Sequence, residues 1–155
     1  MWPTLFTFTN AVAVIGWAAL LFLPRAALVR STVMYAGVGL LCLTYGVIFA
    51  LLVSGSADPG LVAGADGAIK DYSIAGIRAL FQSDGGIVLG WTHYLAFDLF
   101  TGLWIAADAD NKGFGRISQA PFLIATFLAG PIGLGAWLLI RERRARAAAR
   151  AAGGR

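Results

Sequence analysis

Residues 87–107 read IVLGWTHYLAFDLFTGLWIAA, an apolar run that holds a single carboxylate, Asp98. About 20 helical residues cross the hydrocarbon core of a bilayer, and lipid offers the backbone no hydrogen-bond partners, so the run is predicted to be a transmembrane helix. Asp98 lies roughly 16 Å into the run at the helical rise, near the middle of the membrane. A carboxylate at that depth costs at least ~2.5 kcal/mol. We therefore expect Asp98 to face other helices and to serve a function.

Three more apolar runs extend the pattern, at about residues 4–23, 33–53 and 121–140. The chain is 59% hydrophobic and 13% charged, with a mean hydropathy of +0.76, whereas soluble domains carry about 25% charged residues. The first run has no Lys or Arg before it, which favours an uncleaved anchor over a signal peptide. The predicted fold class is all-α, an integral membrane four-helix bundle that forms one domain over residues 1–155.

The connection between the second and third runs has two parts. Residues 54–67 are rich in Gly, Ala, Asp and Ser, which is typical of a flexible loop. Within residues 72–81, Ile74, Ile77 and Phe81 recur at helical spacing. This stripe predicts a short amphipathic helix that lies on the membrane interface between spans two and three.

Basic residues predict the orientation, because Lys and Arg gather on the cytoplasmic side of membrane proteins. Four spans would put both termini and the second connection on one side. That side would hold eight basic residues, namely Lys70, Arg78, Arg141, Arg143, Arg144, Arg146, Arg150 and Arg155. The other side would hold four, namely Arg25, Arg30, Lys112 and Arg116. We therefore expect a multi-pass protein of a bacterial inner membrane, with both termini cytoplasmic and residues 141–155 as a basic tail.

The basic tail also permits a second interpretation, a nucleic-acid-binding arm. The tail is short and continues directly from a membrane helix, so contact with the anionic lipid bilayer is favoured and no nucleic-acid partner is expected. Cys42 is the only cysteine, and the sequence has no CxxC, no GxGxxG and no phosphate-binding loop. We therefore expect no metal and no cofactor.

A helical wheel divides the polar residues of the third span between two faces. Tyr94, Asp98, Thr101 and Asp108 share a face about 80° wide, whereas His93 lies about 140° from Asp98. His93 and Asp98 would flank the two sides of a site, or one of them would face another helix. Both residues could instead only join helices by hydrogen bonds. The catalytic candidates are Asp98, His93 and Tyr94.

Further candidates lie at matching depth on other spans or on the aromatic face of the third. The predicted substrate-binding residues are Asn10, Thr44, Tyr45, Trp91, Phe97, Phe100, Thr101 and Trp104. In the fourth span, residues 130–133 read GPIG and predict a kink that could open room beside the third span. Arg116 could pair with Asp108 or Asp110 on the outer surface.

The chain resembles a known family in residues 91–109, WTHYLAFDLFTGLWIAADA, and in the proline-led helix with GPIG and an arginine end that follows. That family is the abscisic-acid-deficient-4-like family. It comprises small plant plastid membrane proteins with bacterial relatives, associated with making neoxanthin, and this chain resembles a bacterial-type member. The resemblance implies that the ligand is a carotenoid or another long apolar molecule.

The resemblance also implies a reaction. Neoxanthin forms when a carotenoid 5,6-epoxide opens to an allene with a hydroxyl group, which is an isomerisation without net redox change. An intramolecular isomerase of this kind needs an acid for the epoxide oxygen and a base for a neighbouring proton. Asp98 would be the proton donor, since a buried carboxyl can remain neutral, and His93 would be the base.

Two other functions stay open at this point. The chain could be a non-catalytic pigment-binding or accessory subunit of a carotenoid enzyme or photosynthetic complex, which would give it a membrane-protein partner. It could also be a small transporter that uses Asp98 as a proton site. The transporter is least favoured, because the sequence shows no inverted repeat.

Overall fold

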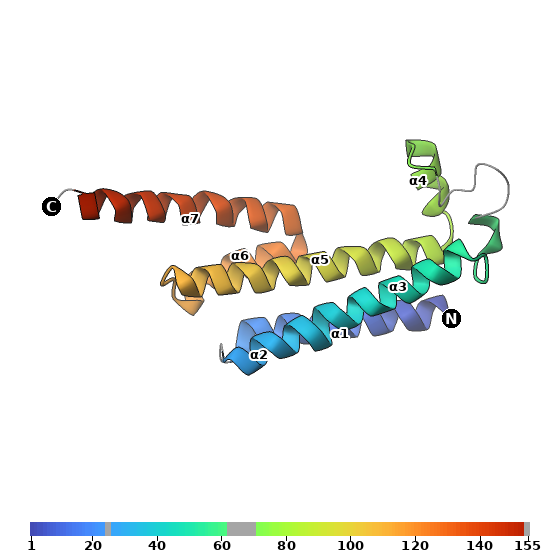
Figure 1. The fold of residues 1–155 in the computed structure, drawn as a ribbon, viewed down its shortest axis with the longest axis horizontal. Coiled ribbons are helices and arrows are strands. Elements are labelled where there is room, and N and C mark those ends of the chain that lie inside the picture. Colours follow the sequence, from blue (N-terminus) through green and yellow to red (C-terminus); the bar gives the residue numbers. More distant parts are fainter. Residues whose placement is uncertain (24–25, 62–70, 154–155) are drawn as a thin grey trace.

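The computed structural model describes residues 1–23, 26–61 and 71–153, with side chains described up to Glu142. These residues form helices and connecting turns without a strand, which confirms the predicted all-helical class (Figure 1). The elements are α1 (Trp2–Phe22), α2 (Ala27–Thr32), the π-helix η1 (Val33–Gly39), α3 (Leu40–Val53), the 3-10 helix η2 (Pro59–Leu61), α4 (Ile74–Leu80), α5 (Asp84–Asn111), α6 (Arg116–Leu128) and α7 (Gly130–Gly153).

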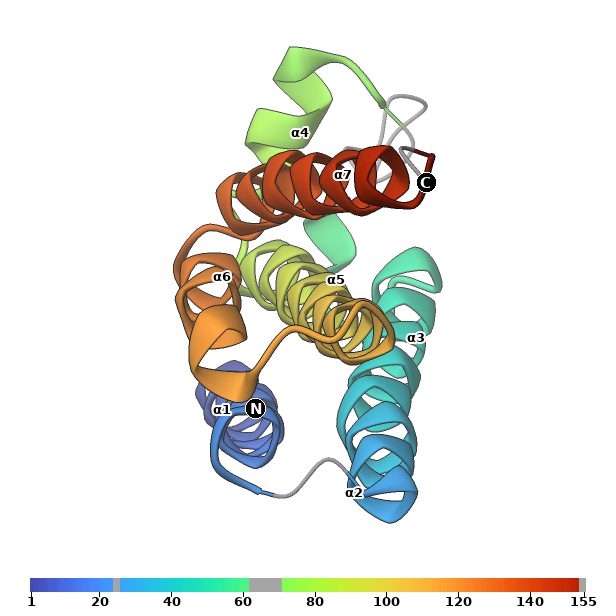
Figure 2. The same cartoon turned by 90° about the vertical axis from the view of Figure 1, so that its left-hand side faces the viewer.

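Three long helical stretches form the frame of the molecule: α1, the continuous stretch α2–η1–α3, and α5 (Figures 1 and 2). Within the described chain, two of them, α1 and the stretch Ala27–Val53, are long and apolar enough to cross a membrane. Leu99 of α5 is fully buried where the three meet. A Cβ on Gly16 of α1 would lie 2.7 Å from a Leu99 methyl carbon, and one on Gly37 of η1 would lie 3.1 Å away. The two glycines thus let the frame close around Leu99.

The predicted fourth span, residues 121–140, is wrong as a single helix. The chain instead forms α6, turns at Ala129 and returns as α7. Ala129 has an extended backbone, with φ −157° and ψ 79°, and the two helices run in opposite directions side by side (Figure 1). The 13 residues of α6 rise only about 20 Å. This α6–α7 hairpin therefore reaches the middle of α5 and goes back.

The sequence at residues 130–133 produces a turn rather than the predicted kink. Pro131 stands in the first turn of α7, where its missing N–H costs no helical hydrogen bond and its fixed φ suits the start of a helix. Gly133 lies directly against α6, because a Cβ there would overlap the backbone of Thr126. Proline thus starts α7, and glycine holds it close to α6.

The hairpin also changes where the chain ends. In Figure 1, α1 begins at one end of the molecule and α7 finishes at the opposite end. Three helical stretches of the described chain run between the two ends, and the hairpin adds no further crossing. The predicted four-span bundle is therefore not confirmed, and the structure places the two termini at opposite ends instead of at one end.

Arg116 has different partners from those predicted. Its Nη2 donates to the carbonyl oxygens of Leu21 and Leu23 at 3.2 Å and 2.7 Å. These carbonyls end α1 and lack partners within their own helix, so the arginine caps α1 from the start of α6. Asp110 instead pairs with Arg30 at 3.4 Å.

The predicted amphipathic helix is present as α4, and the other helices cover its apolar stripe only in part: the Phe81 ring lies against Gly90 of α5. Ile74, Ile77 and Phe81 leave 79%, 47% and 46% of their surface exposed. Its contact with a membrane interface stays a prediction. Residues 62–67 of the expected flexible loop and the side chains of the basic tail beyond Glu142 lie outside the described residues.

Candidate active site

Asp98 is buried in the middle of α5, at the turn of the hairpin. Only 9% of its surface is exposed. The Tyr94 hydroxyl and the Gly130 backbone N–H lie beside its carboxylate in hydrogen-bonding positions. The Oδ2 atom is buried and has no hydrogen-bond partner among the described residues. An unpaired carboxylate oxygen in an apolar interior is costly, which makes Asp98 a candidate for a functional position.

Gly130 makes the contact between the hairpin and Asp98 possible. A Cβ at this position would overlap the Asp98 carboxylate. Gly130 is also the first residue of α7, so the amide end of that helix, which carries positive partial charge, lies at the carboxylate. The expectation that Asp98 faces other helices agrees with this geometry.

Asp98 is the last residue of a stripe along one face of α5. The hairpin leaves the first half of this stripe uncovered. Ile87, Trp91, Tyr94 and Asp98 follow one face of the helix. In Figure 1, α6 and α7 accompany only the C-terminal half of α5. Ile87 and Trp91 accordingly leave 43% and 39% of their surface exposed. An apolar ligand that lies along this open half would have its end beside Tyr94 and Asp98.

The open stripe continues onto α1 through aromatic rings. Trp91 stacks on Tyr94 with ring centroids 5.3 Å apart, and its Nε1 donates to Asn10 Oδ1 at 3.1 Å. Phe6 lies 5.9 Å from the Trp91 ring. Phe6 also lines an open groove of about 280 Å³ between α1 and the start of α5. The structure thus brings three predicted site residues, Asn10, Trp91 and Tyr94, to the side of Asp98.

His93 lies on the other side of α5. Its ring is 5.7 Å from Tyr45 of α3 and 4.6 Å from Phe97. Thr44, the neighbour of Tyr45, donates its hydroxyl to Leu40 of its own helix at 2.8 Å. Of the two arrangements that the helical wheel left open, the structure shows the one in which His93 faces another helix. It does not bring His93 into contact with Asp98.

The remaining predicted residues line a separate groove between α5 and α7, the α5–α7 groove. It has a volume of about 390 Å³ and is lined by Phe100, Thr101, Trp104, Leu134 and Leu138. Thr101 lies one turn along α5 from Asp98, but neither Asp98 nor Tyr94 lines the groove. The predicted single aromatic cavity is therefore divided among the open stripe, the His93 side and this groove.

Asp108 holds the hairpin against α5, a role that the sequence analysis missed. Its carboxylate accepts hydrogen bonds from Arg141 Nε and Nη2 at 2.7 Å and 2.9 Å and from Trp137 Nε1 at 3.1 Å. Lys112 lies 3.5 Å away. Burial alone would raise the pKa of Asp108, but these hydrogen bonds and positive charges outweigh it and hold the pKa below its usual range. Its place on the Asp98 face was the available signal, since residues on that face meet the hairpin.

We expect Arg141→Ala to lower the free energy of unfolding by about 2–4 kcal/mol, because it removes the bidentate partner of a mostly buried carboxylate. Arg30→Ala is a matched control, since its pair with Asp110 is longer and more exposed and should contribute under about 1 kcal/mol. Denaturant titration of the detergent-purified protein measures both. Equal losses in the two variants would contradict the role of Asp108 and Arg141.

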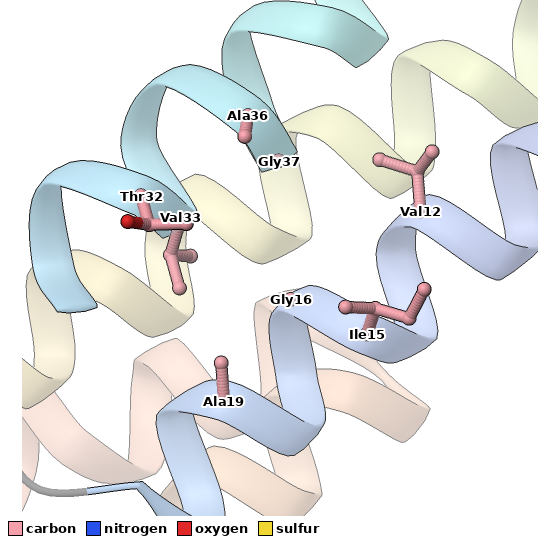
Figure 3. Close-up of a pocket in the computed structure, with 8 residues that line it drawn as sticks. All are labelled: Val12, Ile15, Gly16, Ala19, Thr32, Val33, Ala36 and Gly37. Carbon is pink, nitrogen blue, oxygen red and sulfur yellow. The ribbon is translucent and has the colours of Figure 1, made fainter.

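One other described side chain, the buried Gln119, also has an oxygen without a hydrogen-bond partner, and its amide nitrogen donates to Asp110 Oδ1 and to the Phe114 carbonyl oxygen. A cavity of about 130 Å³ between α1 and the α2–η1 segment has no charged residue in its lining (Figure 3). Its lining residues are Val12, Ile15, Gly16, Ala19, Thr32, Val33, Ala36 and Gly37. No group of three or more His, Cys, Asp or Glu side chains suited to a metal ion occurs among the described residues.

Comparison with known proteins gives one finding. A model of the ABA DEFICIENT 4-like family matches residues 4–137 of the chain. The match includes α1 to α6 and the first third of α7, and so contains the whole Asp98 site. A search of curated proteins and a search of solved structures found no match.

Proposed function

The chain belongs to the ABA DEFICIENT 4-like family, and from this premise we propose that it is a membrane-embedded isomerase that opens the epoxide of a carotenoid. The family places the chain in the context of carotenoids and neoxanthin. The reaction and its residues are our proposal. The observation that carries it is the buried carboxylate of Asp98, with one unpaired oxygen and the Tyr94 hydroxyl beside it.

We place α1, α2–η1–α3 and α5 across the bilayer, with the α6–α7 hairpin entering and leaving from one side. The outward faces of these helices are rich in exposed large apolar side chains, such as Ile15, Leu43 and Phe97. A hairpin that ends inside the membrane is tolerated where protein or a cavity surrounds its turn. Here the turn at Gly130 lies against Asp98.

This placement predicts that the C-terminus is cytoplasmic and the N-terminus is on the other side. By position in the chain, ten of the 12 basic residues belong to one end: Arg25, Arg30, Lys112, Arg116, Arg141, Arg143, Arg144, Arg146, Arg150 and Arg155. Only Lys70 and Arg78 belong to the other. This imbalance is larger than that of the four-span arrangement and favours the basic end as cytoplasmic.

Reporter fusions measure this topology. A reporter that is active only in the periplasm should work at the N-terminus and fail at the C-terminus in a bacterial host. A fluorescent protein that folds only in the cytoplasm should give the opposite result. The same reporter active at both ends would contradict the proposed placement.

The net result of the proposed reaction is the transfer of one proton from a chain carbon to the epoxide oxygen, by way of Asp98 and Tyr94. Tyr94 donates its hydroxyl proton to the epoxide oxygen as the C–O bond on the chain side breaks. Asp98 takes the proton from the adjacent chain carbon, and the electron pair of that C–H bond forms the new double bond of the allene. The oxygen stays on the other ring carbon as a hydroxyl group. Asp98 then returns its proton to Tyr94, so the cycle needs no co-reactant.

The roles of Asp98 and Tyr94 follow from their surroundings. Burial disfavours the charged form of Asp98, and the Gly130 amide at the start of α7 offsets part of that cost, which helps the carboxylate to act as a base. Tyr94 lies within hydrogen-bonding reach of that carboxylate, which allows direct return of the proton. His93 stays outside this relay, because its ring contacts Tyr45 and Phe97 on the other side of α5.

The alternative is a non-catalytic subunit that binds or delivers a pigment. The open aromatic stripe of Phe6, Trp91 and Tyr94 favours it, because such rings would hold a polyene without any chemistry. Expression of the chain alone in cells that make epoxy-carotenoids separates the two functions. An isomerase changes the pigment profile, whereas a binding subunit changes only which pigment co-purifies.

A further inference from the structure

The α5–α7 groove has no part in the proposed reaction, and its lining suits a hydrocarbon chain. Among its five lining residues, the only polar side-chain groups are the Thr101 hydroxyl and the Trp104 ring nitrogen. Phe100, Trp104 and Leu138 are also exposed on the outer surface, to 44%, 38% and 43%. In the proposed membrane placement, the groove opens sideways to lipid.

One end of the groove carries two cations. The Arg141 guanidinium lies over the Trp104 ring, 5.5 Å from its centroid. Arg141 and Lys112 both contact the single carboxylate of Asp108. The Arg141 and Lys112 side chains are 27% and 32% exposed, compared with 14% for Asp108. These three side chains, two more exposed cations and one shielded carboxylate, together carry a net charge of +1.

The distance between these cations and the middle of α5 fits one leaflet of a bilayer. Asp98 and Asp108 are separated by ten helical residues, or about 15 Å at the helical rise. Half of the hydrocarbon core has the same thickness. The cations would thus lie at the level of the lipid phosphates, and the groove would run from there toward the ends of the acyl chains.

We propose that the α5–α7 groove binds one acyl chain of an anionic glycerophospholipid, whose phosphate contacts Arg141 and Lys112. Basic pockets between membrane helices on the cytoplasmic side recognise anionic headgroups in this way. A carotenoid is a poorer occupant, because its neutral ends would leave this net positive charge without a partner. The bound lipid would lie along the C-terminal half of α5, beyond the open stripe, and would brace α7 against α5. This inference rests on the proposed membrane placement and not on the isomerase reaction.

Native mass spectrometry of the purified full-length protein tests the proposal. The protein is offered equal amounts of phosphatidylglycerol and phosphatidylcholine with identical chains. We expect it to retain about five times more phosphatidylglycerol than phosphatidylcholine. This ratio corresponds to the attraction of about 1 kcal/mol between an anionic headgroup and one basic residue whose charge is not neutralised. Lys112→Gln should bring that ratio close to one without reducing the total lipid bound.

Neighbouring positions on α7 supply matched variants that test the groove itself. Leu138→Trp fills the groove and should reduce bound lipid at least about fivefold, whereas Leu139→Trp, at an exposed position outside the groove, should leave it unchanged. Leu134→Trp is a second filling variant, in case Leu138→Trp does not fold. Thermal unfolding shows which variants are folded.

Several results would overturn the proposal. Equal retention of the two lipids by the wild-type protein would show that the headgroup does not contact the two cations. Equal lipid content in Leu138→Trp and Leu139→Trp would show that the lipid does not bind in the groove. Displacement of phosphatidylglycerol by an epoxy-carotenoid assigns the groove to the pigment. The experiment contains no isomerase assay, so its failure and the failure of the proposed reaction are separate results.

Discussion

Asp98→Asn is expected to lower the rate of epoxide opening by about 100- to 10,000-fold, the usual contribution of a general acid or base. Asparagine keeps the size of the side chain and can still accept the Gly130 N–H, but it cannot take a proton from the substrate. The variant should fold and insert at least as well as the wild-type protein, because it no longer buries a carboxylate oxygen without a partner. The measurement is the pigment profile of cells that make epoxy-carotenoids, normalised to the amount of membrane protein.

Two further variants separate the roles of the polar residues near Asp98. Tyr94→Phe should lose activity to a similar extent, because it removes the proposed proton donor. His93→Gln should retain most activity, since His93 has no contact with the carboxylate. If Asp98→Asn is fully active, Asp98 is not the base. If His93→Gln is as inactive as Asp98→Asn, then the assignment of His93 as base, which the sequence suggested, is favoured over ours.

Gly130→Ala is expected to reduce activity by about 100-fold through a displacement of roughly 1 Å at the site. The added methyl group would overlap the Asp98 carboxylate, so either the carboxylate or the hairpin turn must move. The backbone of Gly130 does not have a positive φ, so the need for glycine at this position is purely steric. The variant should also lower the free energy of unfolding by about 1–3 kcal/mol, as overpacking does.

Gly135→Ala is the matched control for this prediction. A Cβ on Gly135, on the same helix, would have no atom within 4 Å, and alanine is the better helix former. This variant should be fully active and no less stable than the wild-type protein. The contact between the hairpin and the carboxylate would be contradicted if the two alanine variants had the same activity.

The sequence predicted the helices and the burial of Asp98 because both depend on simple local rules. Apolar runs of about 20 residues became α1, the α2–η1–α3 stretch and α5, each beginning a few residues earlier than expected. Asp98 and Tyr94 share a face because helical periodicity fixes directions along one helix. The same periodicity predicted that His93 lies beside Phe97 on another face of the helix.

The hairpin was missed because length and hydropathy cannot distinguish a helix that crosses a membrane from two that meet inside it. Residues 121–140 satisfy both tests. Two signals pointed to the turn. Gly130 followed by Pro131 is typical of a turn and of a helix start, and the basic residues are divided more unevenly when the tail returns to the side of Arg116.

The hairpin also explains why the predicted site residues do not line one common cavity. Phe100, Thr101 and Trp104 were grouped with Asp98 because they lie on the same span. The hairpin turn at Gly130 covers Asp98, and Leu134 and Leu138 of α7 join the three aromatic and polar residues in a separate groove. Contacts of this kind join segments about 30 residues apart, and no local pattern in a single sequence specifies them.

The hairpin makes the two halves of the molecule unequal in width. Among the described residues, α1, α2–η1–α3 and α5 pass through both halves, whereas α6 and most of the apolar part of α7 occupy only one (Figure 1). In the proposed placement, the protein therefore displaces more lipid from the cytoplasmic leaflet than from the opposite one. A body of this shape acts as a wedge and relieves lateral pressure where the cytoplasmic leaflet is convex. In this placement, the protein should concentrate in regions of the membrane where the cytoplasmic leaflet is convex.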